Sequence, residues 1–278
     1  MIGVFDSGFG GLTVLSALLA ELPEYDYVYL GDNARAPYGG HSKENILKFT
    51  RAGVEFLFEK GARVVILACN SASANALRDL QGEMIREPGV KDKNILGVVV
   101  PIAEAIAEGA NGASETMRIA VIGTQATVES GVYEEEVRKR VGDFEFMQKA
   151  CPLLVPLIEE GWARKMETKR ILKSYLREVK DWRPDVLVPA CTHYPILQKE
   201  IEQVMGSGVR VLETGAIVAA SLKNYLAKHP EIEGLLGRAA NGKGEAGKRE
   251  FYTTDSPEKF AEMGSVFLGQ KIDKVGLA

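Results

Sequence analysis

The sequence predicts an α/β fold built from doubly wound, mainly parallel sheets. Short runs of β-branched and apolar residues recur along the chain, and longer amphipathic stretches separate them. Strands that alternate with helices form βαβ units, whose strands lie parallel in one sheet. A length of 278 residues, set against a working domain size of about 150 residues, favours two such domains over one.

Each expected element has a residue pattern that favours it. The strands are short apolar runs, at Ile2–Phe5, Tyr27–Leu30, Val64–Ala68, Ile95–Val100, Ile119–Gly123, Phe144–Met147, Val186–Pro189, Val209–Leu212 and Phe251–Thr253. The helices are amphipathic stretches, at Lys43–Lys60, Val128–Val141, Thr168–Lys180 and Gln198–Met205.

Nothing in the middle of the chain has the composition of a flexible linker. We therefore expect two domains to exchange chain by short crossings, near Val99–Pro101 and near Gly206–Gly208. The stretch from Gly234 to Gly247 has five glycines among fourteen residues. It is expected to form an exposed loop before the last strand.

The composition is that of an ordinary globular protein. With 46% hydrophobic and 26% charged residues, intrinsic disorder of the whole chain is excluded. The 34 Lys and Arg residues against 38 Asp and Glu give a net charge of −4, which disfavours non-specific binding to nucleic acid. The longest apolar-rich stretch, Leu96–Ala103, is far shorter than the ~20 residues that span a bilayer. We expect no nucleic-acid partner, no membrane segment and no targeting leader.

The cysteine content favours a reducing compartment. Three cysteines make an odd number and include no Cys-x-x-Cys pair, so we expect a cytoplasmic protein without a disulfide framework. The three histidines show no ligand spacing with the cysteines beyond Cys191 and His193. No metal site is therefore predicted.

Two distant segments are similar to each other. In Val64–Ser73 and in Val186–Pro195, a buried-type strand ends in Ala-Cys, and a small polar residue and a helix start follow. We expect Asn70 or Ser71 to be the N-cap of the first helix and Pro195 to stand in the first turn of the second.

This setting gives two of the three cysteines a chemical interpretation. Cys69 and Cys191 would lie at the carboxyl ends of strands, where doubly wound sheets bind ligands. A helix N-terminus beside each would favour thiolate over thiol. Cys151 has no such setting and is expected to be a packing residue.

Two loops rich in glycine and polar residues follow the first two strands. Asp6–Leu12 contains three glycines, which let the backbone approach a ligand closely, but it fits neither the dinucleotide nor the P-loop pattern. An acid at a strand tip would repel phosphate and pair with an ammonium group. A capped turn with Asp6 or Ser7 as N-cap remains an alternative. Gly31–Gly40, taken alone, is typical of a surface turn.

Together these segments resemble a known family. Phe5–Thr13, Gly31–Gly39, Ala68–Ser73 and Cys191–Pro195 resemble the signatures of the glutamate racemases, within the cofactor-independent aspartate/glutamate racemase superfamily. Later blocks of that family are similar to Cys151–Gly161 and Phe251–Thr254. The departures from the family pattern are mild and affect ligand geometry rather than the reaction. They lie at Asn33, Ser71, Pro189–Ala190 and Glu213–Thr214.

The resemblance implies interconversion of L- and D-glutamate by proton transfer at Cα. A thiolate would act as base on one face of the substrate and a thiol as acid on the other. Cys69 would act on D-glutamate with help from Asp6. Cys191 would act on L-glutamate with help from Glu159 and His193.

The resemblance also assigns substrate contacts. Motif position alone favours Glu159 over Glu160 as the assisting acid. Substrate binding would fall to Asp6, Ser7, Tyr38, Gly39, Asn70, Ser71, Thr192 and His193.

The architecture that the resemblance implies is two α/β domains related by pseudo-twofold symmetry. The active site would lie in the cleft between them, with one cysteine from each. The first domain would contain residues 1–98 and 209–278, and the second residues 99–208. No cofactor would be needed, and a homodimer is expected. The D-glutamate would supply peptidoglycan synthesis, and some members are activated by a cell-wall nucleotide precursor.

Other functions stay open from the residues alone. A related racemase could act on aspartate or another acidic amino acid. A thiol-containing binding or redox protein could sense an amino acid without turning it over, although no Cys-x-x-Cys pair supports redox work. A phosphate- or nucleotide-binding module fits the glycine-containing loops less well.

Overall fold

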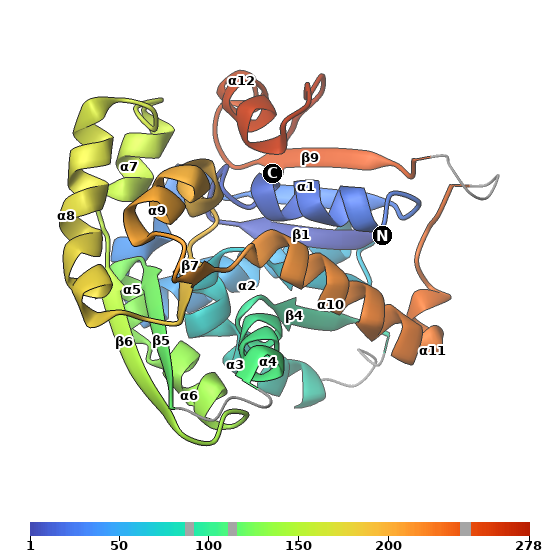
Figure 1. Ribbon diagram of the computed structural model, residues 1–278. Helices are drawn as coiled ribbons and strands as arrows, with labels where there is room; N and C mark the ends of the chain where they lie inside the picture. The colour runs from blue at the N-terminus through green and yellow to red at the C-terminus, as the bar shows by residue number, and fades with distance from the viewer. Residues whose placement is uncertain (87–91, 111–115, 240–245) are drawn as a thin grey trace.

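The computed structural model describes residues 1–86, 92–110, 116–239 and 246–278, and within them the chain forms two sheets flanked by helices (Figure 1). Every strand pair within the two sheets is parallel. The first sheet has the order β10-β9-β2-β1-β3-β4 and the second the order β6-β5-β7-β8. The α/β class with parallel sheets, predicted from the sequence, is confirmed.

The strands lie close to the positions that the apolar runs predict. The first sheet is made of β1 (Ile2–Asp6), β2 (Tyr27–Gly31), β3 (Val64–Leu67), β4 (Asn94–Gly97), β9 (Arg249–Thr253) and β10 (Gly276–Leu277). The second is made of β5 (Met117–Gly123), β6 (Phe144–Ala150), β7 (Val186–Ala190) and β8 (Arg210–Val211).

Four strands of each sheet share one order. In the first sheet the order is β2-β1-β3-β4, and in the second β6-β5-β7-β8, so β3 and β7 hold matching places. The strand expected at 209–212, which the sequence put in the first domain, pairs with β7 in the second sheet. It holds the place there that β4 holds in the first sheet. We propose that the second domain therefore extends through β8, and that the chain returns to the first domain after it.

The described helices pack around these sheets. They are α1 (Leu12–Glu21), α2 (Lys43–Glu59), α3 (Asn70–Arg86), α4 (Val99–Ala110), α5 (Gln125–Glu129), α6 (Val132–Arg138), α7 (Leu154–Glu159), α8 (Met166–Trp182), α9 (Gln198–Met205), α10 (Thr214–Lys228), α11 (Pro230–Glu233) and α12 (Pro257–Leu268). Figure 1 shows α8 on the outer side of the second sheet and α1 between β1 and α12.

The amphipathic patterns explain which helix faces are buried. In α8 the buried residues are Thr168, Leu172, Leu176 and Val179, spaced three or four apart on one face. One hydrophobic cluster runs from α1 through α4 and α10 to the strands of the second sheet, so the two sheets share a core. A second cluster lies between the first sheet and helices α2 and α3.

Three local expectations were wrong. The strand expected over Ile95–Val100 ends at Gly97, and Val99–Pro101 begins α4, which leads from β4 in the first sheet to β5 in the second. Pro101 is compatible with this start, because a proline is tolerated in the first turn of a helix, where the N–H has no partner. The helix expected over Val128–Val141 is divided into α5 and α6, since Gly131 adopts a left-handed conformation with φ +66°. Part of the stretch from Gly234 to Gly247 packs on the loop before β2, through a bridge between Tyr25 and Arg238. Residues 240–245 of that stretch lie outside the described residues.

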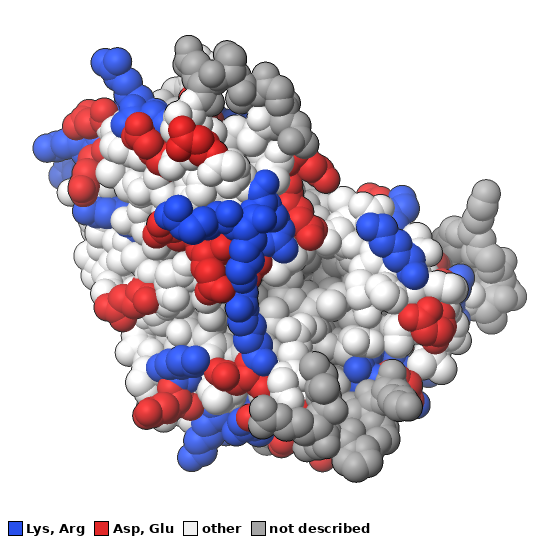
Figure 2. All heavy atoms as spheres, turned by 90° about the horizontal axis from the view of Figure 1, so that it is seen from below, with Lys and Arg blue, Asp and Glu red and all other residues white. Residues whose placement is uncertain are grey.

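The surface agrees with the near-neutral charge balance. Figure 2 shows Lys and Arg side chains interspersed with Asp and Glu on one face of the molecule. Among the helices that the structure describes, none is long and apolar enough to pass through a bilayer.

Candidate active site

Cys69 and Cys191 follow the matching strands of the two sheets. β3 ends at Leu67 and β7 at Ala190, so both thiols lie just beyond the carboxyl end of a strand. Each cysteine exposes only 5% of its surface. Both stand where open α/β sheets place their ligands.

The segments that follow the two cysteines differ. The amide of Ser73 donates a 2.8 Å hydrogen bond to the Cys69 carbonyl, and α3 begins at Asn70. The expected N-cap at Asn70 or Ser71 was therefore wrong, because both residues lie inside the helix. After Cys191 comes a short 3₁₀ helix, Tyr194–Leu197, with Pro195 in its first turn as expected.

Asp6, Ser7 and Thr192 gather beside Cys69. Asp6 ends β1 and is fully buried. Its carboxylate accepts hydrogen bonds from the Gly8 amide at 2.9 Å and from Thr192 Oγ1 at 3.2 Å. The Cys69 thiol donates to Ser7 Oγ at 3.6 Å. A residue from the second cysteine segment thus contacts the first strand end directly.

The first glycine loop makes this contact possible. A Cβ at Gly10 would overlap the side chains of Thr192 and His193, so the loop can approach the second cysteine segment only with glycine there. The N-cap of α1 is Gly11, with no side-chain hydrogen bond. Neither Asp6 nor Ser7 is therefore the N-cap of the helix, although the Asp6 carboxylate accepts from the Gly8 amide within the turn.

Beside Cys191 lies a chain of two further groups. His193 Nδ1 is 3.8 Å from Cys191 Sγ, and its Nε2 is 2.9 Å from Glu159 Oε1. His193 is 3% exposed, and the Glu159 side chain is 23% exposed. Glu159 ends α7, whereas Glu160 follows the helix and is exposed. The geometry therefore joins Glu159, and not Glu160, to the histidine.

The protonation states of the two sides differ. Burial and the nearby Asp6 carboxylate raise the pKa of Cys69 to about 12, and the Ala72 amide and Ser7 do not offset them. The expectation that the helix N-terminus favours the thiolate form of Cys69 was therefore wrong. Burial lowers the pKa of His193, but hydrogen bonds to Cys191 and Glu159 outweigh it and raise that pKa to about 10. At neutral pH, Cys69 is a thiol and His193 an imidazolium.

A group of hydroxyls faces the start of α3. Ser71 Oγ lies 2.9 Å from Thr124 Oγ1 and 3.4 Å from Thr127 Oγ1. Neither threonine was singled out from the sequence. The available signal was position, because Thr124 follows β5 as Asp6 ends β1, and Thr124 caps α5 by accepting from the Thr127 amide.

The second loop is more than a surface turn. Tyr38 is fully buried and donates a 2.5 Å hydrogen bond to Asp32, which is 1% exposed. A Cβ at Gly39 would come within 2.6 Å of the Thr124 side chain. The loop therefore packs against the strand end of the second sheet, and the surface-turn interpretation was wrong for these residues.

Two further observations limit the chemistry. Cys151 is fully buried in the core, and burial raises its pKa to about 12, which fits a packing residue. Within the parts of the chain that the structure describes, no three His, Cys, Asp or Glu side chains are grouped as metal ligands would be.

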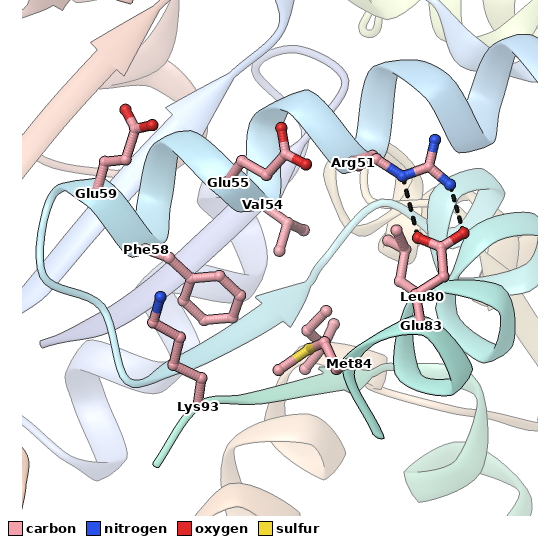
Figure 3. Close-up of a pocket in the computed structure, with 10 residues that line it drawn as sticks. Arg51, Val54, Glu55, Phe58, Glu59, Leu80, Glu83, Met84 and Lys93 are labelled. Carbon is pink, nitrogen blue, oxygen red and sulfur yellow. Dashed lines mark hydrogen bonds and ion pairs between the residues drawn. The ribbon is translucent and has the colours of Figure 1, made fainter. Parts of the chain in front are cut away.

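A separate cavity of about 280 Å³ lies between α2, α3 and β4 (Figure 3). Arg51 and Glu83 form an ion pair at its rim, and Lys93 lies over the ring of Phe58. None of the site residues expected from the sequence lines this cavity.

Comparison with known proteins shows the family to which the chain belongs. Residues 11–222 match the family model described as Asp/Glu/Hydantoin racemase. The chain is 39% identical to the glutamate racemase of Aquifex aeolicus, over 98% of this chain and 95% of that protein.

Solved structures give the same result. Glutamate racemase from Francisella tularensis, in complex with D-glutamate, has a TM-score of 0.85 at 30% identity, covering 100% of this chain and 96% of that one. Glutamate racemase from Escherichia coli, in complex with L-glutamate and the activator UDP-MurNAc-ala, has a TM-score of 0.73 at 25% identity, covering 99% and 97%. The chain therefore belongs to the Asp/Glu/Hydantoin racemase family and, within it, to the glutamate racemases.

Proposed function

We propose that this enzyme interconverts L- and D-glutamate without a cofactor, by proton transfer between Cα and two cysteines. The observation that carries the proposal is the pair of buried thiols at matching strand ends of two sheets. A base and an acid on opposite faces of one carbon are what inversion by proton exchange requires.

In this reaction one thiolate removes the Cα proton and the opposite thiol delivers a proton to the other face. The C–H electron pair stays on the substrate between the two steps, delocalised into its carboxylate. Afterwards the first cysteine is a thiol and the second a thiolate, so the reverse reaction uses the same groups. Cys69 acts on D-glutamate with Asp6, and Cys191 acts on L-glutamate with His193 and Glu159.

The charges around the two thiols support these roles in the L-glutamate direction. The His193 imidazolium lies 3.8 Å from Cys191 Sγ and is an electrostatic partner for a thiolate there. Burial and the Asp6 carboxylate keep Cys69 protonated. In the L-glutamate direction, the protonated Cys69 is the acid that delivers a proton to the face opposite Cys191. A substrate ammonium beside Asp6 would offset the carboxylate charge and ease ionisation of Cys69 for the D-glutamate direction.

Substrate contacts follow from the same geometry. The hydroxyls and amides beside the two thiols can donate to the substrate carboxylates, where charge develops as the proton leaves. We assign substrate binding to Asp6, Ser7, Tyr38, Gly39, Asn70, Ser71, Thr192 and His193, and extend the set to Thr124 and Thr127 because they contact Ser71.

The wider role follows from the product. We propose that the enzyme works in the cytoplasm and supplies D-glutamate for peptidoglycan synthesis, as a homodimer. The Escherichia coli relative was solved with an activator, UDP-MurNAc-ala. Rates measured with and without that nucleotide test whether this chain is activated in the same way.

The direct test is chiral chromatography after incubation with L-glutamate or L-aspartate. We expect D-glutamate to form and D-aspartate to be absent or formed far more slowly. Preferential turnover of aspartate would assign the site to a different acidic amino acid. Stoichiometric binding of glutamate without inversion would show that the protein binds glutamate and does not racemise it.

A further inference from the structure

Tyr133 contacts the active site from the side of the second sheet. It lies in α6, is fully buried, and donates a 2.6 Å hydrogen bond to Asn70 Oδ1. Asn70 is the first residue of α3 and follows Cys69 directly. Burial raises the pKa of Tyr133 above that of a free phenol, so its hydroxyl is a hydrogen-bond donor throughout the physiological pH range.

This hydrogen bond decides which end of the Asn70 amide remains for a ligand. A primary amide has one accepting oxygen and one donating NH₂ group. The Tyr133 hydroxyl occupies the oxygen, and among the described residues no hydrogen bond involves Asn70 Nδ2. Asn70 is therefore left with its donor group, which suits a carboxylate.

An ion-pair cluster holds α6 against α3 two turns away from Asn70. Glu136 is 4% exposed and contacts Arg78 of α3, and Lys139 and Arg140 contact the same carboxylate at 2.9 and 2.6 Å. Burial raises the pKa of Glu136, but the hydrogen bonds from Lys139, Arg140 and Arg78 outweigh it and hold that pKa at about 2. The carboxylate is thus charged at working pH.

Tyr133 and Glu136 stand one turn apart on α6, so they contact α3 from the same side of the helix. Asn70 and Arg78 are their partners on α3. This second contact limits movement of α6 along α3 and so fixes where the Tyr133 hydroxyl meets Asn70.

We propose that Tyr133 is a positioning residue, which orients the Asn70 amide so that its NH₂ group binds the substrate carboxylate next to Cys69. The proposal rests on the proposed glutamate racemisation and adds a residue that acts only through another. It requires the effect of Tyr133 to disappear when the Asn70 amide is removed.

The test is a double-mutant cycle with Tyr133→Phe and Asn70→Ala, measured as kcat and KM for both enantiomers. We expect Tyr133→Phe to lower kcat/KM about tenfold, in the range of one hydrogen bond, with most of the loss in KM, because the carboxylate binds before the proton moves. The factor must be equal in the two directions, since a catalyst cannot shift the equilibrium. Adding Tyr133→Phe to Asn70→Ala should cause no further loss.

The matched control is Tyr27→Phe. Tyr27 is equally buried, and its hydroxyl donates to the carbonyls of Leu22 at 3.0 Å and Leu18 at 3.4 Å, at the end of helix α1. Both Phe variants lose one buried hydroxyl donor, so thermal midpoints should fall by similar amounts while only Tyr133→Phe changes KM.

Additive losses in the double mutant, or wild-type KM in Tyr133→Phe, would overturn the proposal. If Tyr133→Phe does not fold, Glu136→Gln replaces it in the cycle. That variant frees α6 from Arg78 and should raise KM, with no additional effect when Asn70 is alanine; additivity there would equally overturn the proposal. Absence of racemisation by the wild-type enzyme in the same assay would instead refute the proposed function.

Discussion

The contact between His193 and Glu159 allows a quantitative prediction for Glu159→Gln. The amide keeps the size of the side chain and removes its charge. The Nε2–Oε1 distance is 2.9 Å and the Glu159 side chain is 23% exposed, so solvent screens the pair only in part. A hydrogen bond to a charged group contributes about 1.5–3 kcal/mol, and one pKa unit corresponds to about 1.4 kcal/mol. We expect the pKa of His193, about 10 in the native site, to fall by about one unit.

The assay is a ¹³C-resolved NMR titration of the histidine rings, which is tractable because the chain has only three histidines. Glu160→Gln is the matched control, since it removes the same charge from the neighbouring, exposed position. An unchanged His193 titration in Glu159→Gln would refute the coupling. Equal shifts of the His193 pKa in Glu159→Gln and Glu160→Gln would show that the loss of any nearby negative charge, and not the contact with Glu159, causes the shift.

The same shift predicts the pH dependence of stability. The pKa of His193 is raised from 6.5 to about 10 by folding, so the native state binds this proton more tightly than the unfolded state. The stabilisation is complete below pH 6.5 and is lost as the pH rises through about 10. Because Glu159→Gln lowers the pKa of His193 in the folded protein, the stabilisation should be lost at a lower pH in this variant than in the wild type. The free energy of unfolding, measured by urea titration at a series of pH values, checks this.

Three further predictions test the assigned roles. Cys69→Ser and Cys191→Ser should each reduce racemisation by at least ~10², the lower end of what a positioned acid or base contributes, whereas Cys151→Ser should leave turnover largely intact; a folded but equally inactive Cys151→Ser would contradict the assignment. Activity should survive exhaustive dialysis against a chelator, with no pyridoxal absorbance, and recovery of lost activity on adding a divalent metal or pyridoxal phosphate would count against the two-thiol scheme. Asp6→Asn should raise the Cα deuterium isotope effect mainly with D-glutamate and His193→Asn mainly with L-glutamate; identical effects in both directions would remove the reason to place these residues on opposite faces.

Much of the fold could be predicted from the sequence because its signals are local. The run Val64–Ala68 is apolar at every position, which is typical of a strand buried on both faces, and β3 forms there. Element boundaries were harder to predict: α4 begins at Val99, inside the strand expected over Ile95–Val100. The sheet that the strand at 209–212 joins is not a local property, since it depends on pairing with β7.

The site residues that could be predicted are those with reactive side chains at the ends of strands. Cys69, Cys191 and Asp6 follow or end strands, and apolar runs locate those ends. The contacts that join them could not be predicted, because Thr192 and Asp6 are separated by 186 positions. The thiolate expectation for Cys69 failed for a related reason. The helix start is local, but the burial and the Asp6 charge that outweigh it arise only on folding.

The most direct test of the two-thiol account is the fate of the Cα hydrogen of L-glutamate in heavy water. At early times the D-glutamate formed should carry deuterium at Cα, while the remaining L-glutamate stays protiated, because the thiol that delivers the hydrogen is not the one that removes it. Protium retained in the D-glutamate, or deuterium appearing in the remaining L-glutamate as fast as in the product, would show that a single group serves both faces and would contradict the account.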